Sequence, residues 1–323
     1  MSVLLFAEYH NGQLKKSVFE AATYAKDWAT QLGTNLVAFV VGAKNETELA
    51  SLGQFGVETV FVLDNPQLYD LNGQAYASAL AKVAAENNCN AVVFAQTYDS
   101  KIIAPRLAVK MKAASFSGVI SMIQKDGDAF VANRFSHSGK GVQTIGTKSD
   151  KIVVTLKLKS YSVKENPCNC NIVNVDYTPN ANELNLKSVE VLKAGGKLPL
   201  TEADIVVSGG RGLKGPENWG MIEELADLLG AATACSKPVA DVHWRPHHEH
   251  VGQTGIQIAP TLYIAVGISG AIQHLAGVSS SKTIVVVNSD PEAPFFKAAD
   301  FGVVANAFDF LPQFIQAVKS IKG

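Results

Sequence analysis

The sequence predicts an α/β protein with two domains, each built on a mainly parallel sheet, and three observations lead to this prediction. The chain has 323 residues, more than a single hydrophobic core usually serves. Short apolar runs alternate with segments of helical periodicity, which is typical of parallel sheets that helices cover on both faces. Residues 163–200 are irregular and rich in Gly, Pro and Asn, which indicates a boundary. We therefore expect domains at residues 1–195 and 196–323, the second of them Rossmann-like.

In the first domain, continuous apolar and β-branched runs predict buried strands, and amphipathic segments between them predict helices. The expected strands are Val3–Ala7, Leu36–Val41, Thr59–Leu63 and Ala91–Ala95, and the expected helices are Ser17–Leu32, Thr47–Leu52, Ala75–Glu86 and Ile103–Met111. After Ser117 the pattern changes, because three strand-like runs follow without helices between them: Phe130–Arg134, Val142–Ile145 and Ile152–Leu158. We therefore expect the sheet to gain an antiparallel or extended end.

The second domain repeats the α/β pattern. Its expected strands are Asp204–Val207, Ala231–Cys235, Leu262–Val266 and Thr283–Val287, and its expected helices are Ile222–Leu229 and Leu311–Ile321. Four of these strand ends are followed by small or polar residues. Because ligands bind at the carboxyl edge of such sheets, we expect the functional site there.

Composition excludes several classes of partner. The formal net charge is −1, so nothing favours nucleic acid or a membrane surface. The N-terminal MSVLLFAEYHNG lacks the features of a signal peptide, and no apolar run reaches the roughly 18 residues of a spanning helix. The four cysteines are too few for a disulfide framework, and Cys168-x-Cys170 lacks the second ligand pair of a metal site. A reducing cytoplasm suits such thiols.

Two glycine-rich segments carry residues suited to a ligand. Gly210, Gly212 and Gly215 match the glycine fingerprint of dinucleotide-binding folds, and a plain turn between strand and helix explains them equally well. Arg211, placed among these glycines, can bind a phosphate through two hydrogen bonds. In VGQTG, Gln253 and Thr254 offer an amide and a hydroxyl between glycines, although such a pentapeptide also forms ordinary turns.

A third segment, LYIAVGISGAIQHLAG, passes from a strand through a turn into a short helix. This places Ser269 and the amides of Gly270 and Ala271 at a helix N-terminus, which favours anions. Gln273 and His274 follow on the first turn, where a single histidine is more often structural than functional. No Ser-His-Asp order, H-E-x-x-H motif or paired carboxylates accompany these segments. The pattern predicts a site for a large phosphorylated cofactor without acid–base machinery.

The stretch HWRPHHEH holds four of the seven histidines of the chain. Histidine is the commonest metal ligand and the usual acid–base group at neutral pH, so a metal site and a catalytic centre are both hypotheses for it. Arg245-Pro246 interrupts any helix, so the histidines cannot share one helical face at i, i+4 spacing. We expect a solvent-facing loop that delivers Gln253 and Thr254 to the site.

Together, VVSGGRGLKGPENW, ACSKPVAD, VGQTG, LYIAVGISGAIQHLAG and VVNSDPEAPFFKAADFGVVAN resemble the C-terminal domain of the electron transfer flavoprotein alpha-subunit family of bacterial type. The first half resembles this family more loosely, in APRLAVKM and KIVVTLKLKSYS. The resemblance implies an electron carrier without substrate turnover of its own. It also implies an obligate beta subunit and one FAD, held mainly by the C-terminal domain. Electrons would come from acyl-CoA and related dehydrogenases of fatty acid β-oxidation and would pass to a membrane quinone oxidoreductase.

The same resemblance assigns the site residues. Arg211 would contact FAD, and Ser236, Lys237 and Gln253 would lie by the isoalloxazine, with Thr254 bonded to N5. Ser269, Gln273 and His274 would lie along the flavin and its phosphates, and a protonated His274 would supply positive charge near N1 and O2 of the one-electron-reduced flavin. Asn288 and the pair Asn306-Ala307 would hold the adenosine end. The remaining motif positions are Val251, Gly252, Gly267, Gly270, Ala271 and Ile272.

The chain departs from the family pattern at several positions. Lys237 stands where Arg is usual and lacks its planar fork, so we expect an altered flavin potential with FAD retained. Asn306 replaces a common Asp, Ile256 replaces a common Lys, and HSGKG at 137–141 replaces the usual A-G-N. Three alternatives stay open at this stage: an electron-bifurcating relative with a second FAD, a NAD-dependent dehydrogenase that uses the glycine turn, and a metal-dependent hydrolase that uses the histidine cluster.

Overall fold

The computed structural model describes residues 2–10, 12–139, 141–185 and 199–322, and these residues fold into two compact units. Unit 1 is Met1–Val191 and unit 2 is Leu192–Gly323. The domain boundary predicted at 195/196 lies outside the described residues. Within the described part, no helix has the length and apolar character needed to cross a membrane. All four cysteines are free thiols.

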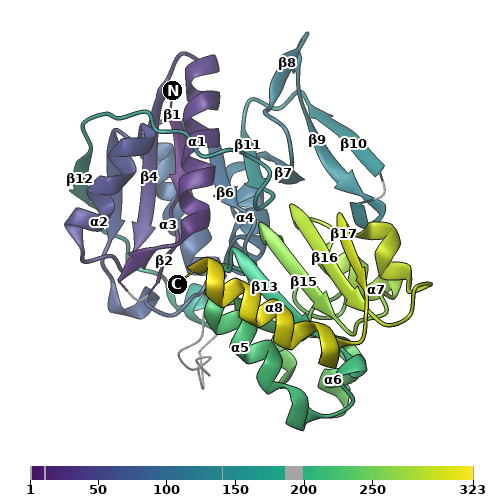
Figure 1. The fold of residues 1–323 in the computed structure, drawn as a ribbon. Helices are drawn as coiled ribbons and strands as arrows, with labels where there is room; N and C mark the ends of the chain where they lie inside the picture. The colour runs from purple at the N-terminus through teal and green to yellow at the C-terminus, as the bar shows by residue number, and fades with distance from the viewer. Residues whose placement is uncertain (1, 11, 140, 186–198, 323) are drawn as a thin grey trace. The chain divides into compact units, whose positions relative to one another are not determined.

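Unit 1 is built on a ten-stranded sheet in the order β10-β9-β7-β11-β6-β1-β4-β5-β12, with β8 paired to β9 (Figure 1). The strands are β1 Ser2–Phe6, β4 Asn35–Val41, β5 Thr59–Leu63, β6 Cys89–Ala95, β7 Ala114–Val119, β8 Gln124–Asp126, β9 Ala129–Ser136, β10 Gly141–Thr147, β11 Ile152–Leu156 and β12 Asn171–Asn174. Neighbours from β7 to β12 along this order are parallel, whereas β8, β9 and β10 pair antiparallel. The predicted α/β class and the antiparallel end are therefore confirmed.

The helices of unit 1 cover both faces of this sheet (Figure 1). Since side chains alternate along a strand, β1 divides its residues between two cores. Val3 and Leu5 pack with α1, Lys16–Gln31, and the short α2, Glu46–Ala50. Leu4 and Phe6 pack with α3, Gly73–Glu86, and α4, Tyr98–Met111. A small antiparallel pair, β2 Tyr9–His10 and β3 Gln13–Leu14, follows β1.

The structure corrects three expectations in unit 1. Helix α4 begins at Tyr98, five residues before the predicted start, because Thr97 forms a capping box with Ser100. Strand β7 was not predicted. Part of the irregular segment is strand β12, which pairs with β5 at the sheet edge and therefore belongs to unit 1.

Unit 2 has a five-stranded parallel sheet in the order β14-β13-β15-β16-β17. The strands are β13 Ile205–Gly209, β14 Ala232–Cys235, β15 Leu262–Val266, β16 Thr283–Asn288 and β17 Phe301–Val304, and the helices are α5 Gly220–Leu229, α6 Lys237–Asp241, α7 Ile272–Val278 and α8 Ala307–Lys322. Helices α5, α6 and α8 pack on one face, whereas α7 and the 3-10 turn Pro294–Ala298 pack on the other. Strand β17 was not predicted.

The strand order of unit 2 fixes where a ligand can bind. From β13 the chain goes to β14 on one side, and then to β15 on the other side. The loops that leave the carboxyl ends of β13 and β15 therefore run in opposite directions and leave a crevice between them.

Candidate functional site

A cavity of about 540 Å³ lies at this carboxyl edge of the unit 2 sheet. Its volume falls within the range of small-molecule sites, about 300–1,000 Å³. The predicted residues that line it are Arg211, Ser236, Lys237, Val251, Gly252, Gln253, Thr254, Gly267, Ser269, Ala271, Gln273, His274 and Asn288. The other predicted residues, Gly270, Ile272, Asn306 and Ala307, are not part of its wall. Four lining residues were not predicted, namely Pro238, His250, Ile268 and Asp290, and a fifth, Gly212, was named only as part of the glycine fingerprint.

Glycines bring the backbones of two loops into direct contact at the crevice. The Gly210 N–H donates to the Val266 carbonyl at 2.9 Å, and the Gly212 N–H donates to the Gly267 carbonyl at 3.0 Å. A Cβ on Gly210 would lie 2.2 Å from the Gly267 oxygen, so no other residue fits there without a shift of the backbone. Gly215 precedes a 3-10 turn, and α5 starts only at Gly220. The glycines thus serve loop packing and do not open a helix as in the dinucleotide fingerprint.

Two cations lie at the cavity without protein partners. Arg211 and Lys237 are both exposed, and in the described part of the chain neither makes a side-chain hydrogen bond or an ion pair. Arg211 follows the end of β13, whereas Lys237 is the first residue of α6 after β14. Each charge is therefore available to an anionic group of a ligand.

The VGQTG segment forms a tight turn in the cavity wall. The Gly252 N–H donates to the Ile256 carbonyl at 3.2 Å, and the Gln253 N–H donates to the Gln273 carbonyl at 2.7 Å. These bonds use the backbone of the turn and leave the side chains of Gln253 and Thr254 exposed at the cavity. An amide and a hydroxyl are thus held on a fixed backbone, where they can hydrogen-bond a polar heterocycle.

His274 is one of two buried histidines of the site, together with His250. Its Nε2 lies 2.8 Å from the hydroxyl of Tyr263, and its ring meets the Phe295 ring edge to face with centroids 5.7 Å apart. Its Nδ1 is buried and has no hydrogen-bond partner of normal geometry. Burial, reinforced by the nearby His250, lowers the pKa of His274 to about 4. The protein alone therefore holds His274 neutral at pH 7, and a protonated ring beside the reduced flavin stays a prediction.

The predicted anion turn and the two asparagines have mainly structural contacts. Helix α7 begins at Ile272, after the turn that contains Ser269, so that hydroxyl is not at the helix N-terminus itself. The Asn288 amide donates to the Ile268 carbonyl at 2.9 Å and its oxygen accepts from the Asp290 N–H at 3.0 Å. Asn288 therefore shapes the loop after β15. Asn306 lies before α8, where its side-chain oxygen accepts from the Phe308 N–H at 3.2 Å.

The HWRPHHEH stretch is not wholly a solvent-facing loop, and the prediction was wrong for its end. Arg245 binds Glu249 through two hydrogen bonds of 2.6 and 2.8 Å and lies over the Trp219 ring. This fold of the loop buries Glu249 and places His250 in the cavity wall with 7% exposure. The other three histidines of the stretch are exposed. Nothing in their individual sequence context distinguished His250 from them.

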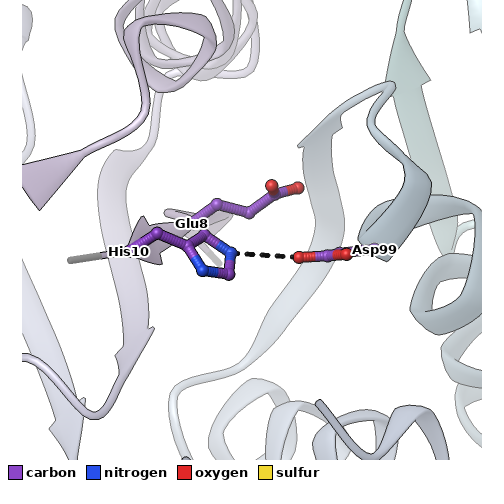
Figure 2. Close-up of side chains that lie close together, drawn as sticks. All are labelled: Glu8, His10 and Asp99. Carbon is purple, nitrogen blue, oxygen red and sulfur yellow. Dashed lines mark hydrogen bonds and ion pairs between the residues drawn. The ribbon is translucent and has the colours of Figure 1, made fainter. Parts of the chain in front are cut away.

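A second cluster lies in unit 1, at the carboxyl ends of β1 and β6, and brings together Glu8, His10 and Asp99 (Figure 2). Among the described residues, these three side chains place potential metal-ligand atoms within 4.8 Å of one another. Lys15 binds Glu8 at 2.8 Å and lies 3.8 Å from Asp99, so an ammonium already lies beside both carboxylates and offsets one of their two charges. His10 binds Asp99 at 3.1 Å. The network joins the β2–β3 pair to the start of α4, and we assign it a structural role.

Comparison with known proteins identifies the family. Residues 199–279 match the family described as "Electron transfer flavoprotein FAD-binding domain", and residues 3–191 match "Electron transfer flavoprotein domain". The electron transfer flavoprotein subunit alpha of Thermoanaerobacterium thermosaccharolyticum is 33% identical over 99% of this chain and 98% of its own. The alpha subunit of Syntrophomonas wolfei is 35% identical over 98% of this chain and 98% of its own length. That of Bacillus subtilis is 32% identical over 99% of this chain and 98% of its own length. The chain therefore belongs to the electron transfer flavoprotein family, as an alpha-subunit type electron carrier with an FAD-binding domain in its second unit.

Proposed function

We propose that FAD occupies the cavity at the carboxyl edge of β13, β14, β15 and β16. The observation that carries this proposal is the convergence of predicted FAD contacts from five separate segments on one cavity. The residue types suit the cofactor. Arg211 and Lys237 offer unpaired positive charge for the diphosphate or the flavin, while Gln253 and Thr254 offer hydrogen bonds to the heterocycle. Bound FAD supplies the redox chemistry, because no side chain of the cavity is a redox group.

In this proposal the residues of the site bind FAD and orient its ring system. Thr254 and Gln253 hydrogen-bond the flavin edge, and Lys237 lies by the ring system. The buried Tyr263–His274 pair holds the His274 ring in place through the 2.8 Å hydrogen bond. Negative charge on a bound flavin next to this ring would raise the pKa of His274 from its low value towards neutrality. Asn288 keeps the loop after β15 in position, and Asn306 and Ala307 would hold the adenosine end of FAD.

We further propose that the chain works as one half of a heterodimer with an electron transfer flavoprotein beta subunit, in the cytoplasm. Acyl-CoA dehydrogenases and related enzymes deliver electrons to it, and a membrane quinone oxidoreductase takes them up. These partners follow from the family resemblance. We also propose that residues 1–195 form the domain that packs with the beta subunit and that residues 196–323 form the FAD domain.

Co-expression of the chain with an electron transfer flavoprotein beta subunit of the same organism tests this function. The purified complex should be yellow, should contain one FAD and should lose its visible absorbance when an acyl-CoA dehydrogenase and its substrate are added. Two FAD per complex would instead indicate the electron-bifurcating variety. A colourless complex would refute the proposal.

A further inference from the structure

A second cavity, of about 390 Å³, lies in unit 1 at the carboxyl ends of β6, β7 and β11, beside the β9–β10 hairpin. Gln96, Ser117, Gly118, Arg134, Phe135, Ser136, His137, Gln143 and Lys157 line it. The function proposed above uses none of these residues. The cavity wall contains amides, hydroxyls and cations but no carboxylate.

The positive charge of this cavity lacks compensation. Arg134 uses Nε and Nη2 to bind the side-chain oxygen of Gln143, at 3.1 and 2.9 Å, and has no carboxylate partner within the described residues. Lys157 lies over the ring of Phe135, 5.2 Å from its centroid, and it likewise forms no ion pair in the described part of the chain. Burial and the neighbouring Lys101 both lower the pKa of Lys157. An anion in the cavity would stabilise the charged form of Lys157 and so offset the unfavourable effects of burial and of Lys101.

The backbone around the cavity contains a β-bulge and two residues with positive φ. The pairing of β7 with β11 contains a bulge, where Gly118 adopts a φ of +68° and donates its N–H to Thr155 Oγ1 at 2.9 Å. The Gln96 amide occupies the space that a Gly118 side chain would need, since a Cβ would lie 2.9 Å from its nitrogen. His137 has a φ of +51°, which is rare for a residue with a side chain. Bulges and such residues concentrate at binding sites.

We propose that this cavity is a second binding site of the chain, for the phosphate group of a small molecule. Lys157 and Arg134 supply the positive charge, and the Gln96 amide and the Ser117 and Ser136 hydroxyls supply further donors from three strands or strand ends. Donors that converge from several directions suit the four oxygens of a phosphate better than the two of a carboxylate. The site shares no residue with the FAD cavity, since every residue of its lining belongs to unit 1 and the FAD cavity is lined by unit 2.

Competitive labelling of lysines in the FAD-loaded complex tests the proposal. A trace of acetic anhydride is added with increasing inorganic phosphate at constant ionic strength, and peptide mass spectrometry measures acetylation of Lys157. The exposed Lys125, on β8 and outside the cavity, serves as the reference within the same chain. We expect phosphate to protect Lys157 in a saturable manner and to leave Lys125 unchanged.

Calorimetric titration of the same complex with phosphate adds a second measurement. Lys157→Gln should weaken the phosphate affinity by about tenfold or more, the loss expected for one charge-assisted hydrogen bond, whereas Lys125→Gln should leave it unchanged. Equal protection of Lys157 by acetate would assign the cavity to carboxylates and overturn the phosphate proposal. Labelling of Lys157 that phosphate does not alter, or that is absent from the start, would also overturn it. The FAD content of the complex is measured in parallel, so failure of this proposal and failure of the FAD assignment can be told apart.

Discussion

Mild acid should selectively destabilise unit 2 through the protonation of His274. The pKa of this side chain falls from its ordinary value of 6.5 to about 4 in the folded protein, because the ring is buried and lies near His250. Between these two values the unfolded chain binds more protons than the folded one, so the contribution to stability is complete above pH 6.5 and is lost as the pH falls towards 4. The linkage relation then gives a loss of about 2 kcal/mol at pH 5 and about 3 kcal/mol at pH 4.

The measurement is urea unfolding of the FAD-free chain between pH 7.5 and 5, followed by fluorine NMR of 5-fluorotryptophan. The chain has three tryptophans, and Trp219 and Trp244 report on unit 2 separately from Trp28 in unit 1. His274→Gln keeps a polar group near Tyr263 but cannot take up the proton. We expect this variant to be less stable than the original at pH 7.5, and the difference to shrink by about 2 kcal/mol at pH 5.

The comparison rests on the slope with pH and not on the absolute stability of the variant. His248→Gln is the matched control, because His248 is exposed in the same half of the chain and its replacement should leave the slope unchanged. If the original chain and His274→Gln lose stability in parallel from pH 7.5 to 5, the burial argument for His274 is refuted.

Three further predictions concern unit 2. Gly277→Ala should destabilise unit 2 by about 1–3 kcal/mol in thermal melts, because the new Cβ would lie 2.5 Å from the backbone of Gly252. Gly220→Ala is the control, since a Cβ there meets open space, and it should be neutral or slightly stabilising. Arg245→Leu should lower the stability of unit 2 by about 2 kcal/mol, because it leaves the buried Glu249 without its cation; breaking a fully buried ion pair would cost more. Adding Glu249→Gln to this variant should restore part of the lost stability. Additive effects of the two substitutions in this double-mutant cycle would contradict the account. Lys237→Arg should retain FAD and shift its midpoint potential in spectroelectrochemistry, since the planar guanidinium binds and stacks differently from an ammonium; an unchanged potential would show that this residue does not act on the flavin.

Most interior strands could be predicted from the sequence to within a few residues, and the exception is β7, which is only partly buried. Thr59–Leu63 and Leu262–Val266 are observed with the predicted bounds, because both are continuous apolar runs within a parallel sheet. Two edge strands, β12 and β17, were missed for the opposite reason. Asn171–Asn174 and Phe301–Val304 are short and largely exposed, so their sequences carry little burial pattern, and their pairing is set by the strand next to them.

The sequence allowed us to predict which loops form the candidate site, but not the contacts between those loops. Residues such as Ser236 and Ser269 follow strands whose carboxyl ends meet at one edge, a regularity that the sequence order of strands and helices reveals. The contact of Gly210 with Gly267 joins segments far apart in the chain, so no local pattern indicates it. His250 was missed because the Arg245–Glu249 pair, a feature of the folded loop, decides which histidine turns inward.

The central claim is that FAD binds in the cavity at the carboxyl edge of the unit 2 sheet, and blocking that cavity tests it most directly. Ala271 is exposed at the cavity wall, so Ala271→Trp should fill the cavity without disturbing the core. Ser279→Trp, at the exposed far end of α7, is the control. Each complex with the beta subunit is purified, and FAD per complex is measured by absorbance and mass spectrometry. We predict a colourless but folded Ala271→Trp complex and a control that retains a full complement of FAD. A folded Ala271→Trp complex with unchanged FAD would contradict the account.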